Sequence, residues 1–194
     1  MANDKVARHD EPTLTSKLVY EGHVVRLEEH TVELPNGHTA TREVVRHNGA
    51  VAVVAELADE RLVLVEQFRK APGKRLLELP AGKLEPGESP DICALRELRE
   101  ETGYVTDRVR RLYSFYTSPG FADEVISLFY ATDLREGVTQ PDEDEFVDIR
   151  LFSRADVQTA LDEGAFEDAK TLVGVLWWLS VPAAEKAENG DRVL

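Results

Sequence analysis

Three glutamates that lie close together in the sequence are spaced for metal chemistry. Glu97 and Glu101 stand four residues apart, and Glu100 stands three from Glu97, so on a helix their carboxylates project from one face. Like charges in this arrangement repel at a cost of roughly a few tenths of a kcal/mol per pair, and a divalent cation between them removes that cost. Ligands that offer only oxygen favour Mg²⁺ or Mn²⁺ over zinc. The spacing therefore indicates a phosphate-transfer site, with a solvated acidic helix face as the alternative.

The residues around these glutamates predict the helix that positions them. In the stretch Glu88-Ser89-Pro90-Asp91, the serine can cap a helix, the proline suits its first position and the aspartate complements its dipole. Gly103 suits the end of the same helix. The residues expected to form its buried apolar stripe are Ile92, Ala94, Leu95 and Leu98.

The three glutamates belong to a longer pattern that resembles the Nudix box. Its fixed positions here are Gly82, Glu88, Arg96, Glu97, Glu100, Glu101 and Gly103. Seven such matches coincide by chance roughly once in 10⁸ placements, which sets aside the solvated-face interpretation. Tyr104 is the one departure, since the box usually has an aliphatic residue there.

The resemblance covers about residues 15–180 and implies a fold, a metal and a ligand set. The fold is an α/β/α sandwich with a mixed β-sheet, preceded by an N-terminal β-unit. By position in the box, Glu97, Glu101, Glu100 and the carbonyl of Ala81 would bind Mg²⁺, with Mn²⁺ as the alternative. An ion pair between Arg96 and Glu88 would support the helix rather than contact substrate.

A second string resembles the ADP-ribose pyrophosphatase subfamily within this family. Pro119 stands sixteen residues beyond Gly103, in the string Ser118-Pro119-Gly120-Phe121-Ala122-Asp123-Glu124; by itself Pro-Gly would mark only a turn. Similar enzymes also use arginine around the nucleotide, which implies roles for Arg42 and Arg69, because guanidinium groups pair with diphosphate or stack on adenine. Surface ion pairs are the alternative for both arginines. The implied substrate-binding residues are Arg42, Arg69, Pro119, Gly120 and Phe121.

Hydrolysis also needs a base to take a proton from water. Similar enzymes carry that glutamate in a loop that corresponds to Asp142-Glu143-Asp144-Glu145. Glu143 is the first candidate, Glu145 the second, and Glu100 on the helix the third. The alternative interpretation of the loop is a solvated run of charge.

The resemblance implies Mg²⁺-dependent hydrolysis of ADP-ribose to AMP and ribose 5-phosphate. One rival is a pyrophosphatase for another nucleotide sugar, such as GDP-mannose, or for a dinucleoside polyphosphate. Another is a module that senses ADP-ribose without cutting it, which would predict a damaged box or an attached DNA-binding domain. Similar enzymes are homodimers in which the N-terminal β-unit of one subunit reaches the site of the other, and the apolar segment Val19–Val45 suits such an exchange.

Several further elements are needed to position these residues. An N-terminal hairpin is expected from Val19–Leu34 and Thr39–Arg46 around the turn Pro35-Asn36-Gly37. The later strands expected from apolar and β-branched runs are Ala50–Ala55, Arg61–Phe68, Arg110–Thr117, Val125–Thr132 and Phe146–Phe152. A capping box at Ser153 and Asp156 opens a helix to about Gly164, and Asp168–Leu179 forms a last helix. We expect flexible ends at 1–13 and 183–194, a β-unit at 14–46 and a catalytic domain at 47–182.

Composition limits the partners of the chain. Its 194 residues suffice for one compact catalytic unit, and 42% hydrophobic with 31% charged residues is typical of an ordinary globular protein. The net charge of −14 opposes docking on nucleic acid. With no apolar run that could span a bilayer and no apolar leader, we expect a cytoplasmic protein without a membrane partner. The single cysteine, Cys93, is expected to be a buried small side chain.

Overall fold

The computed structural model describes residues 9–137 and 146–182, which fall into two compact units. The first unit consists of Met1–Asn48 with Tyr116–Glu124, and the second of Gly49–Phe115 with Val125–Leu194. The first unit therefore contains Tyr116–Glu124 as well as the N-terminal segment, although the sequence assigned those nine residues to the catalytic domain.

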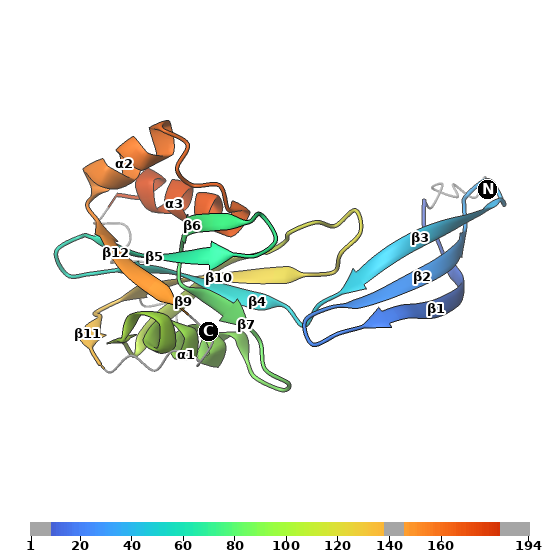
Figure 1. The fold of residues 1–194 in the computed structure, drawn as a ribbon, viewed down its shortest axis with the longest axis horizontal. Coiled ribbons are helices and arrows are strands. Elements are labelled where there is room, and N and C mark those ends of the chain that lie inside the picture. The colour runs from blue at the N-terminus through green and yellow to red at the C-terminus, as the bar shows by residue number, and fades with distance from the viewer. Residues whose placement is uncertain (1–8, 138–145, 183–194) are drawn as a thin grey trace, which may run out of the picture. The chain divides into compact units, whose positions relative to one another are not determined.

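The first unit is a three-stranded antiparallel sheet in the order β1-β2-β3, where β1 is Thr13–Glu21, β2 is Arg26–Glu33 and β3 is Thr39–Arg46 (Figure 1). The predicted hairpin is present as β2 and β3, which pair antiparallel. Its first strand was predicted too long, because a turn separates β1 from β2: the amide of Gly22 donates to the carbonyl of Val25 at 2.9 Å. The turn at residues 35–37 is confirmed, with Gly37 at a φ of 81° that favours glycine.

The segment Tyr116–Glu124 is fastened to β3 by its backbone and by one carboxylate. The amide of Val45 donates to the carbonyl of Phe121 at 2.8 Å, and the amide of Asp123 donates to the carbonyl of Val45 at 3.1 Å. Asp123 also accepts hydrogen bonds from the Arg46 guanidinium at 3.0 Å and from the His47 amide at 2.8 Å. The string that suggested substrate specificity is therefore held against the N-terminal sheet.

The second unit is built on a seven-stranded mixed sheet. Its main path is β12-β5-β4-β10-β9, in which β4 is parallel to β10 and antiparallel to β5. The strands of this sheet are β4 (Ala50–Glu56), β5 (Leu62–Arg69), β6 (Lys74–Glu78), β7 (Ala81–Lys83), β9 (Arg108–Tyr116), β10 (Val125–Thr132) and β12 (Val147–Phe152). The short strands β8 (Tyr104–Val105) and β11 (Arg135–Glu136) form a separate pair.

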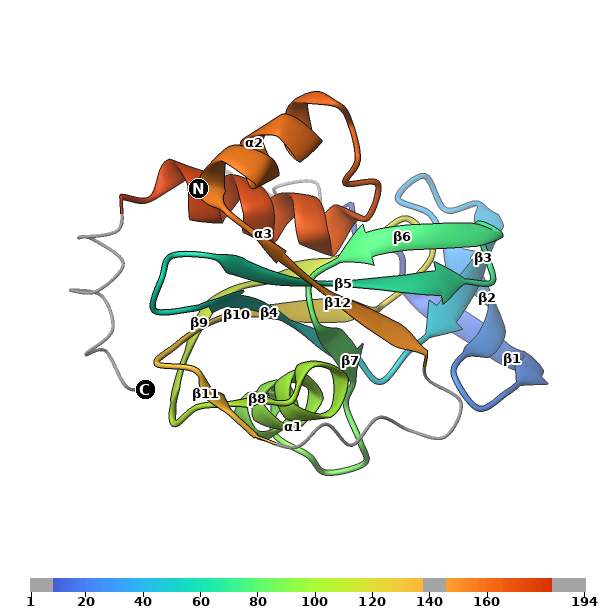
Figure 2. The same ribbon diagram turned by 60° about the vertical axis from the view of Figure 1, so that its left-hand side comes forward.

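Both faces of the sheet are covered by helices, which makes the unit an α/β/α sandwich and confirms the predicted fold. Figure 2 shows α2 (Arg154–Asp162) and α3 (Ala169–Ser180) over one face and α1 (Pro90–Thr102) over the other. Strand β4 is wholly buried, and the side chains of its alternate residues pack into two separate hydrophobic cores. Val54 packs in the core beneath α3 with Trp178, whereas Val53 packs in the core beneath α1 with Leu98.

Helix α1 has the predicted bounds and part of the predicted stripe: Ala94 and Leu98 are buried and Leu95 is half-buried. Its end at Gly103 is confirmed, with a φ of 72°, whereas the Ser89 side chain makes no capping hydrogen bond. Ile92 is 58% exposed, contrary to the prediction. The buried face runs through Ala94 and Leu98, and a residue two positions before Ala94 lies about 200° around the helix from it. The predicted capping box of α2 is present.

Within the described ranges, every helix is too short or too polar to cross a bilayer. Cys93 is buried and free, as expected.

Candidate active site

The carboxylates of Glu97 and Glu101 turn inward from α1 onto strand β7. Both residues are nearly buried, at 7% and 4% exposure. The carboxylate of Glu101 accepts a hydrogen bond of 3.0 Å from the amide of Ala81. A Cβ added at Gly82 would lie 1.9 Å from the carboxyl carbon of Glu97. Gly82 is therefore needed because it leaves space for this carboxylate.

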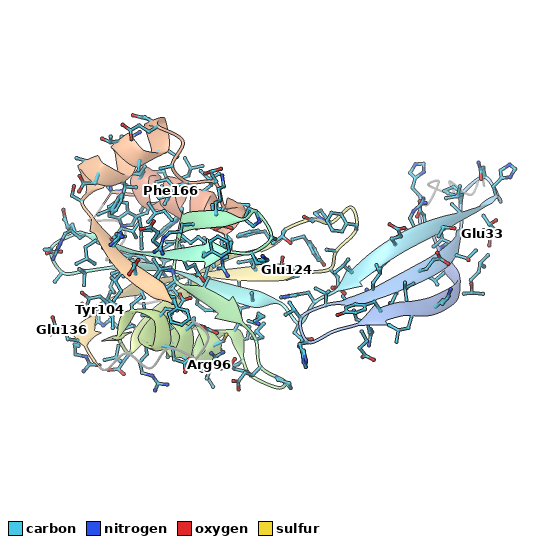
Figure 3. The ribbon with its side chains drawn as sticks, viewed as in Figure 1. Glu33, Arg96, Tyr104, Glu124, Glu136 and Phe166 are labelled. Atoms are coloured by element: carbon cyan, nitrogen blue, oxygen red, sulfur yellow. The ribbon has the colours of Figure 1, made fainter. Side chains whose placement is uncertain are left out.

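Arg96, labelled in Figure 3, lies on α1 and hydrogen-bonds to several acidic residues of the site. Its guanidinium donates to both oxygens of Glu88 at 2.8 and 2.9 Å, so the predicted ion pair is present. The same group donates to Glu97 at 2.8 Å and to Glu100 at 2.9 Å. Hydrogen bonding from Arg96 lowers the pKa of Glu88 to about 2. At neutral pH the site therefore holds one fixed positive charge among several carboxylates.

This arrangement fits a divalent cation, although the described residues contain no group of three acidic, histidine or cysteine side chains already placed around one point. Arg96 draws Glu97 and Glu100 towards itself, while Glu101 bonds to the amide of Ala81. The donor set consists of oxygen atoms only, which suits a hard cation. Gly82 provides the room beside Glu97. The predicted ligands Glu97, Glu100 and Glu101 thus share one region with Ala81.

Four of the predicted substrate residues lie together in the first unit. Arg42, Pro119, Gly120 and Phe121 line one shallow pocket of about 410 Å³. In it the guanidinium of Arg42 donates to both carboxylate oxygens of Glu11, at 2.8 and 2.6 Å. Glu11 was not anticipated from the sequence, because it lies 31 residues away in an otherwise featureless polar segment.

Arg69, the fifth predicted substrate residue, is already engaged within the second unit. Its guanidinium donates to both oxygens of Glu78 at 2.7 and 2.8 Å. The pKa of Arg69 is raised by these hydrogen bonds first, and further by the charges of Glu78, Glu101 and Asp168. Lys170 donates to the same Glu78 carboxylate. Neither Glu78 nor Lys170 stood out in the sequence, since no motif connects two single charges so far apart.

The candidate bases Glu143 and Glu145 lie outside the described residues. The chain that leads towards them is attached to the end of α1, because the amide of Gly137 donates to the carbonyl of Gly103 at 2.7 Å.

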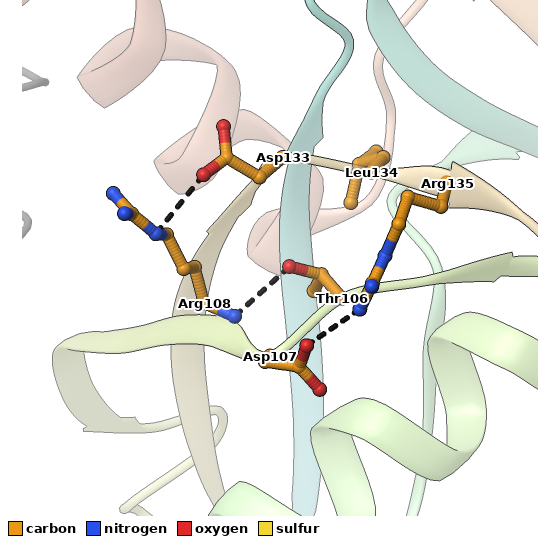
Figure 4. Close-up of a pocket in the computed structure, with 6 residues that line it drawn as sticks. All are labelled: Thr106, Asp107, Arg108, Asp133, Leu134 and Arg135. Carbon is orange, nitrogen blue, oxygen red and sulfur yellow. Dashed lines mark hydrogen bonds and ion pairs between the residues drawn. The ribbon is translucent and has the colours of Figure 1, made fainter.

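A second surface pocket lies between the ends of other strands and holds none of the predicted site residues. Figure 4 shows Arg108 paired with Asp133 at 3.0 Å and Arg135 paired with Asp107 at 2.5 Å. All four side chains are more than 60% exposed. Their charges balance one another in water, so this pocket offers no chemistry comparable to that of α1.

The sandwich fold and the acidic face of α1 against β7 define a Nudix-type hydrolase. Residues 46–173 match the family model described as NUDIX domain, and residues 11–45 match the model described as nucleoside diphosphate sugar hydrolase N-terminal domain. The chain belongs to the Nudix family.

Two relatives and one solved structure are similar to this chain over most of its length. It is 47% identical to "Methanol dehydrogenase activator" of Bacillus methanolicus and 42% identical to "ADP-ribose pyrophosphatase" of Bacillus subtilis. Each match covers 86% of this chain and 91% of the relative. A structure described as an ADP compounds hydrolase shares the fold, with a TM-score of 0.77 at 23% identity over 94% of this chain and 97% of that one.

Proposed function

We propose that this protein hydrolyses the diphosphate bond of ADP-ribose, giving AMP and ribose 5-phosphate, with Mg²⁺ as its metal and Mn²⁺ as the alternative ion. The observation that carries the proposal is the complete set of box carboxylates on α1, with Glu97 and Glu101 turned onto Ala81 and Gly82. The 42% identity to a protein named ADP-ribose pyrophosphatase supports the choice of substrate.

The chain's own residues have separable tasks in this reaction. Glu97, Glu101, Glu100 and the carbonyl of Ala81 would hold the cation, which when bound supplies Lewis-acid polarisation of phosphate oxygens and a lower pKa for water. Arg96 keeps Glu97 and Glu100 oriented through its hydrogen bonds. Glu143 would accept the proton of the attacking water.

Two arginines would make the main charged contacts with the substrate. Arg42, with Pro119, Gly120 and Phe121, would bind the nucleotide, and Arg69 would bind the diphosphate. A guanidinium suits both tasks because it pairs bidentately with phosphate and stacks on aromatic bases. When a substrate replaces Glu11 and Glu78 as their partners, these arginines supply positive charge that helps to offset the net charge of −14.

We expect kcat/KM for ADP-ribose to exceed the values for GDP-mannose, NADH and diadenosine polyphosphates. The reason is the Pro119 string, which lines the same pocket as Arg42. The measurement is release of product from each compound at equal Mg²⁺ concentration. A preference for any of the other compounds would favour the rival nucleotide-sugar or dinucleotide activity. Binding of ADP-ribose without any turnover would instead favour the sensing module.

We further propose that the protein is a homodimer joined through its N-terminal sheet. All nine residues of β1 are exposed, and its large apolar side chains, Leu14, Leu18, Val19 and Tyr20, are each more than half exposed. In the described part of β1, β2 and β3 only Val32 is buried. Three strands with so little core of their own need apolar contacts from elsewhere.

Light scattering at micromolar concentration is expected to give about twice the chain mass of 21.7 kDa. Replacing Leu18 by Asp should shift the mass towards the monomer, because it places a charge in the apolar contact. Lys17→Asp is the matched control, since Lys17 is an exposed polar neighbour on the same strand. A monomeric mass for the unmodified chain, together with unchanged ADP-ribose affinity after deletion of residues 1–45, would contradict the dimer.

A further inference from the structure

A buried carboxylate in the second unit is shared by two cations that approach it from different elements. Glu78, the last residue of β6, is fully buried. Arg69, the last residue of β5, reaches it with two parallel hydrogen bonds of 2.7 and 2.8 Å. Lys170, in the first turn of α3, donates to the oxygen Oε2 of the same carboxylate. Figure 2 shows β5 and β6 side by side, with α3 beyond them.

Lys170 is fixed in its place by the N-cap of α3. Its ammonium also donates to Asp168 at 2.9 Å. Asp168 caps the helix by accepting from the amide of Thr171 at 3.0 Å and from its hydroxyl at 2.6 Å. The Thr171 hydroxyl oxygen accepts in turn from the amide of Leu79, next to Glu78, at 3.0 Å. Lys170 is therefore part of a local framework that joins α3 to the end of β6.

The two cations differ in their access to solvent. The side chain of Arg69 is 39% exposed, whereas those of Lys170 and Glu78 are 12% and 1% exposed. Glu101 on α1 lies within electrostatic reach of Arg69. Because of its exposure, Arg69 is the member of the cluster that can turn away from Glu78. Lys170 is enclosed and stays with Glu78.

Charge pairing decides whether Arg69 can move. A buried carboxylate is strongly destabilised when it loses its last cationic partner. With Lys170 present, Glu78 keeps one charged partner after Arg69 has left. Without Lys170, Arg69 would have to remain on Glu78, and its two hydrogen bonds would not be available to a ligand.

We propose that Lys170 is a positioning residue, which keeps Glu78 paired and so releases Arg69 to bind the diphosphate of the substrate. The inference rests on the proposed function, because it takes a nucleoside diphosphate as the ligand of Arg69. Glu78 in this arrangement holds the guanidinium until a diphosphate competes for the same bidentate hydrogen bonds.

The first test compares Lys170→Met with Lys170→Arg. Lys170→Met should raise KM for ADP-ribose roughly 10- to 100-fold, the effect of losing hydrogen bonds to a charged group, with kcat little changed. Lys170→Arg, which keeps the charge, should stay near the unmodified enzyme. Lys74→Met is the matched control: Lys74 lies on β6 and pairs with Glu167 at the surface. An unchanged KM in Lys170→Met would overturn the proposal.

The second test removes the Glu78 carboxylate. It distinguishes two roles of Glu78, which are to hold Arg69 away from the substrate or to orient Arg69 for the substrate. If Glu78 retains Arg69, Glu78→Gln should leave KM unchanged or lower, and the double variant Glu78→Gln/Lys170→Met should recover the KM lost in Lys170→Met. If Glu78 instead orients Arg69 for the substrate, Glu78→Gln should raise KM tenfold or more, which would overturn the proposal. Glu78→Gln alone decides this point even if Lys170→Met does not fold.

Calorimetric binding of ADP separates failure of this inference from failure of the proposed function. ADP carries the diphosphate without the second ribose, and its affinity measured in chelator does not depend on turnover, because the proposed hydrolysis requires the cation. The order of the variants in affinity for ADP should match their order in KM. Arg69→Met should lower the affinity for ADP to the level of Lys170→Met. If the variants show that order of ADP affinity but the unmodified protein does not cleave ADP-ribose, only the proposed substrate is wrong. Equal ADP affinity in Arg69→Met would overturn the inference.

Discussion

Replacing either inward-facing glutamate of α1 by glutamine is expected to lower kcat/KM for ADP-ribose by roughly 10²–10³-fold, because a ligand of the cation is lost and such an ion contributes several kcal/mol to the transition state. Glu101→Gln retains an oxygen that can accept from the amide of Ala81, and Glu97→Gln retains its shape beside Gly82. Both variants should therefore stay folded. Steady-state kinetics and thermal unfolding by circular dichroism measure the two effects.

The matched control is Glu163→Gln, an exposed glutamate at the end of α2 that should leave turnover unchanged. A chelator should abolish turnover of the unmodified enzyme, and excess Mg²⁺ should restore it. Unchanged turnover in chelator would show that the carboxylates do not act through a divalent cation.

Glu143→Gln is expected to depress kcat by about 10²–10⁴-fold, the usual effect of removing a general base. An amide keeps the shape of the side chain but cannot accept the proton of water, so KM and metal affinity should change little. The measurement is kcat and KM at saturating Mg²⁺, with metal affinity determined separately by calorimetry.

Glu145→Gln is the internal control for this prediction, because both residues belong to the same acidic stretch. A large loss in Glu145→Gln with almost none in Glu143→Gln would move the role of the base to Glu145. If neither variant loses activity, Glu100 becomes the candidate. Arg96 pairs with Glu100 in the structure, so Glu100→Gln would then require comparison with Arg96→Lys.

Local chemistry was sufficient to predict α1 and the central strands of the sheet. The buried strands β4, β5 and β10 are apolar and β-branched because helices cover both of their faces. The bounds of α1 follow from Pro90 at its start and Gly103 at its end. These signals lie within a few residues of the features that they specify, so tertiary contacts were not needed to interpret them.

Other features depend on contacts that the sequence does not display. Strands β6 and β7 were missed because their short segments, KRLLE and AGK, have too few residues for a clear alternation. Glu97 was expected on a charged face, yet it is nearly buried because Gly82 leaves room for it. The pairing of Glu78 with Lys170 joins residues 92 positions apart and becomes visible only in the fold.

The hydrogen bonds of Arg96 also bear on whether the protein folds before or after it binds metal. The guanidinium of Arg96 pairs with Glu88, Glu97 and Glu100 and so offsets part of the negative charge around α1. In small zinc domains the ligands have no such substitute, and the apoprotein remains unfolded until metal arrives. Here the second unit also has two apolar cores on either side of β4. We therefore expect the second unit to fold before it binds metal, so that withdrawal of the ion would stop turnover without unfolding the chain.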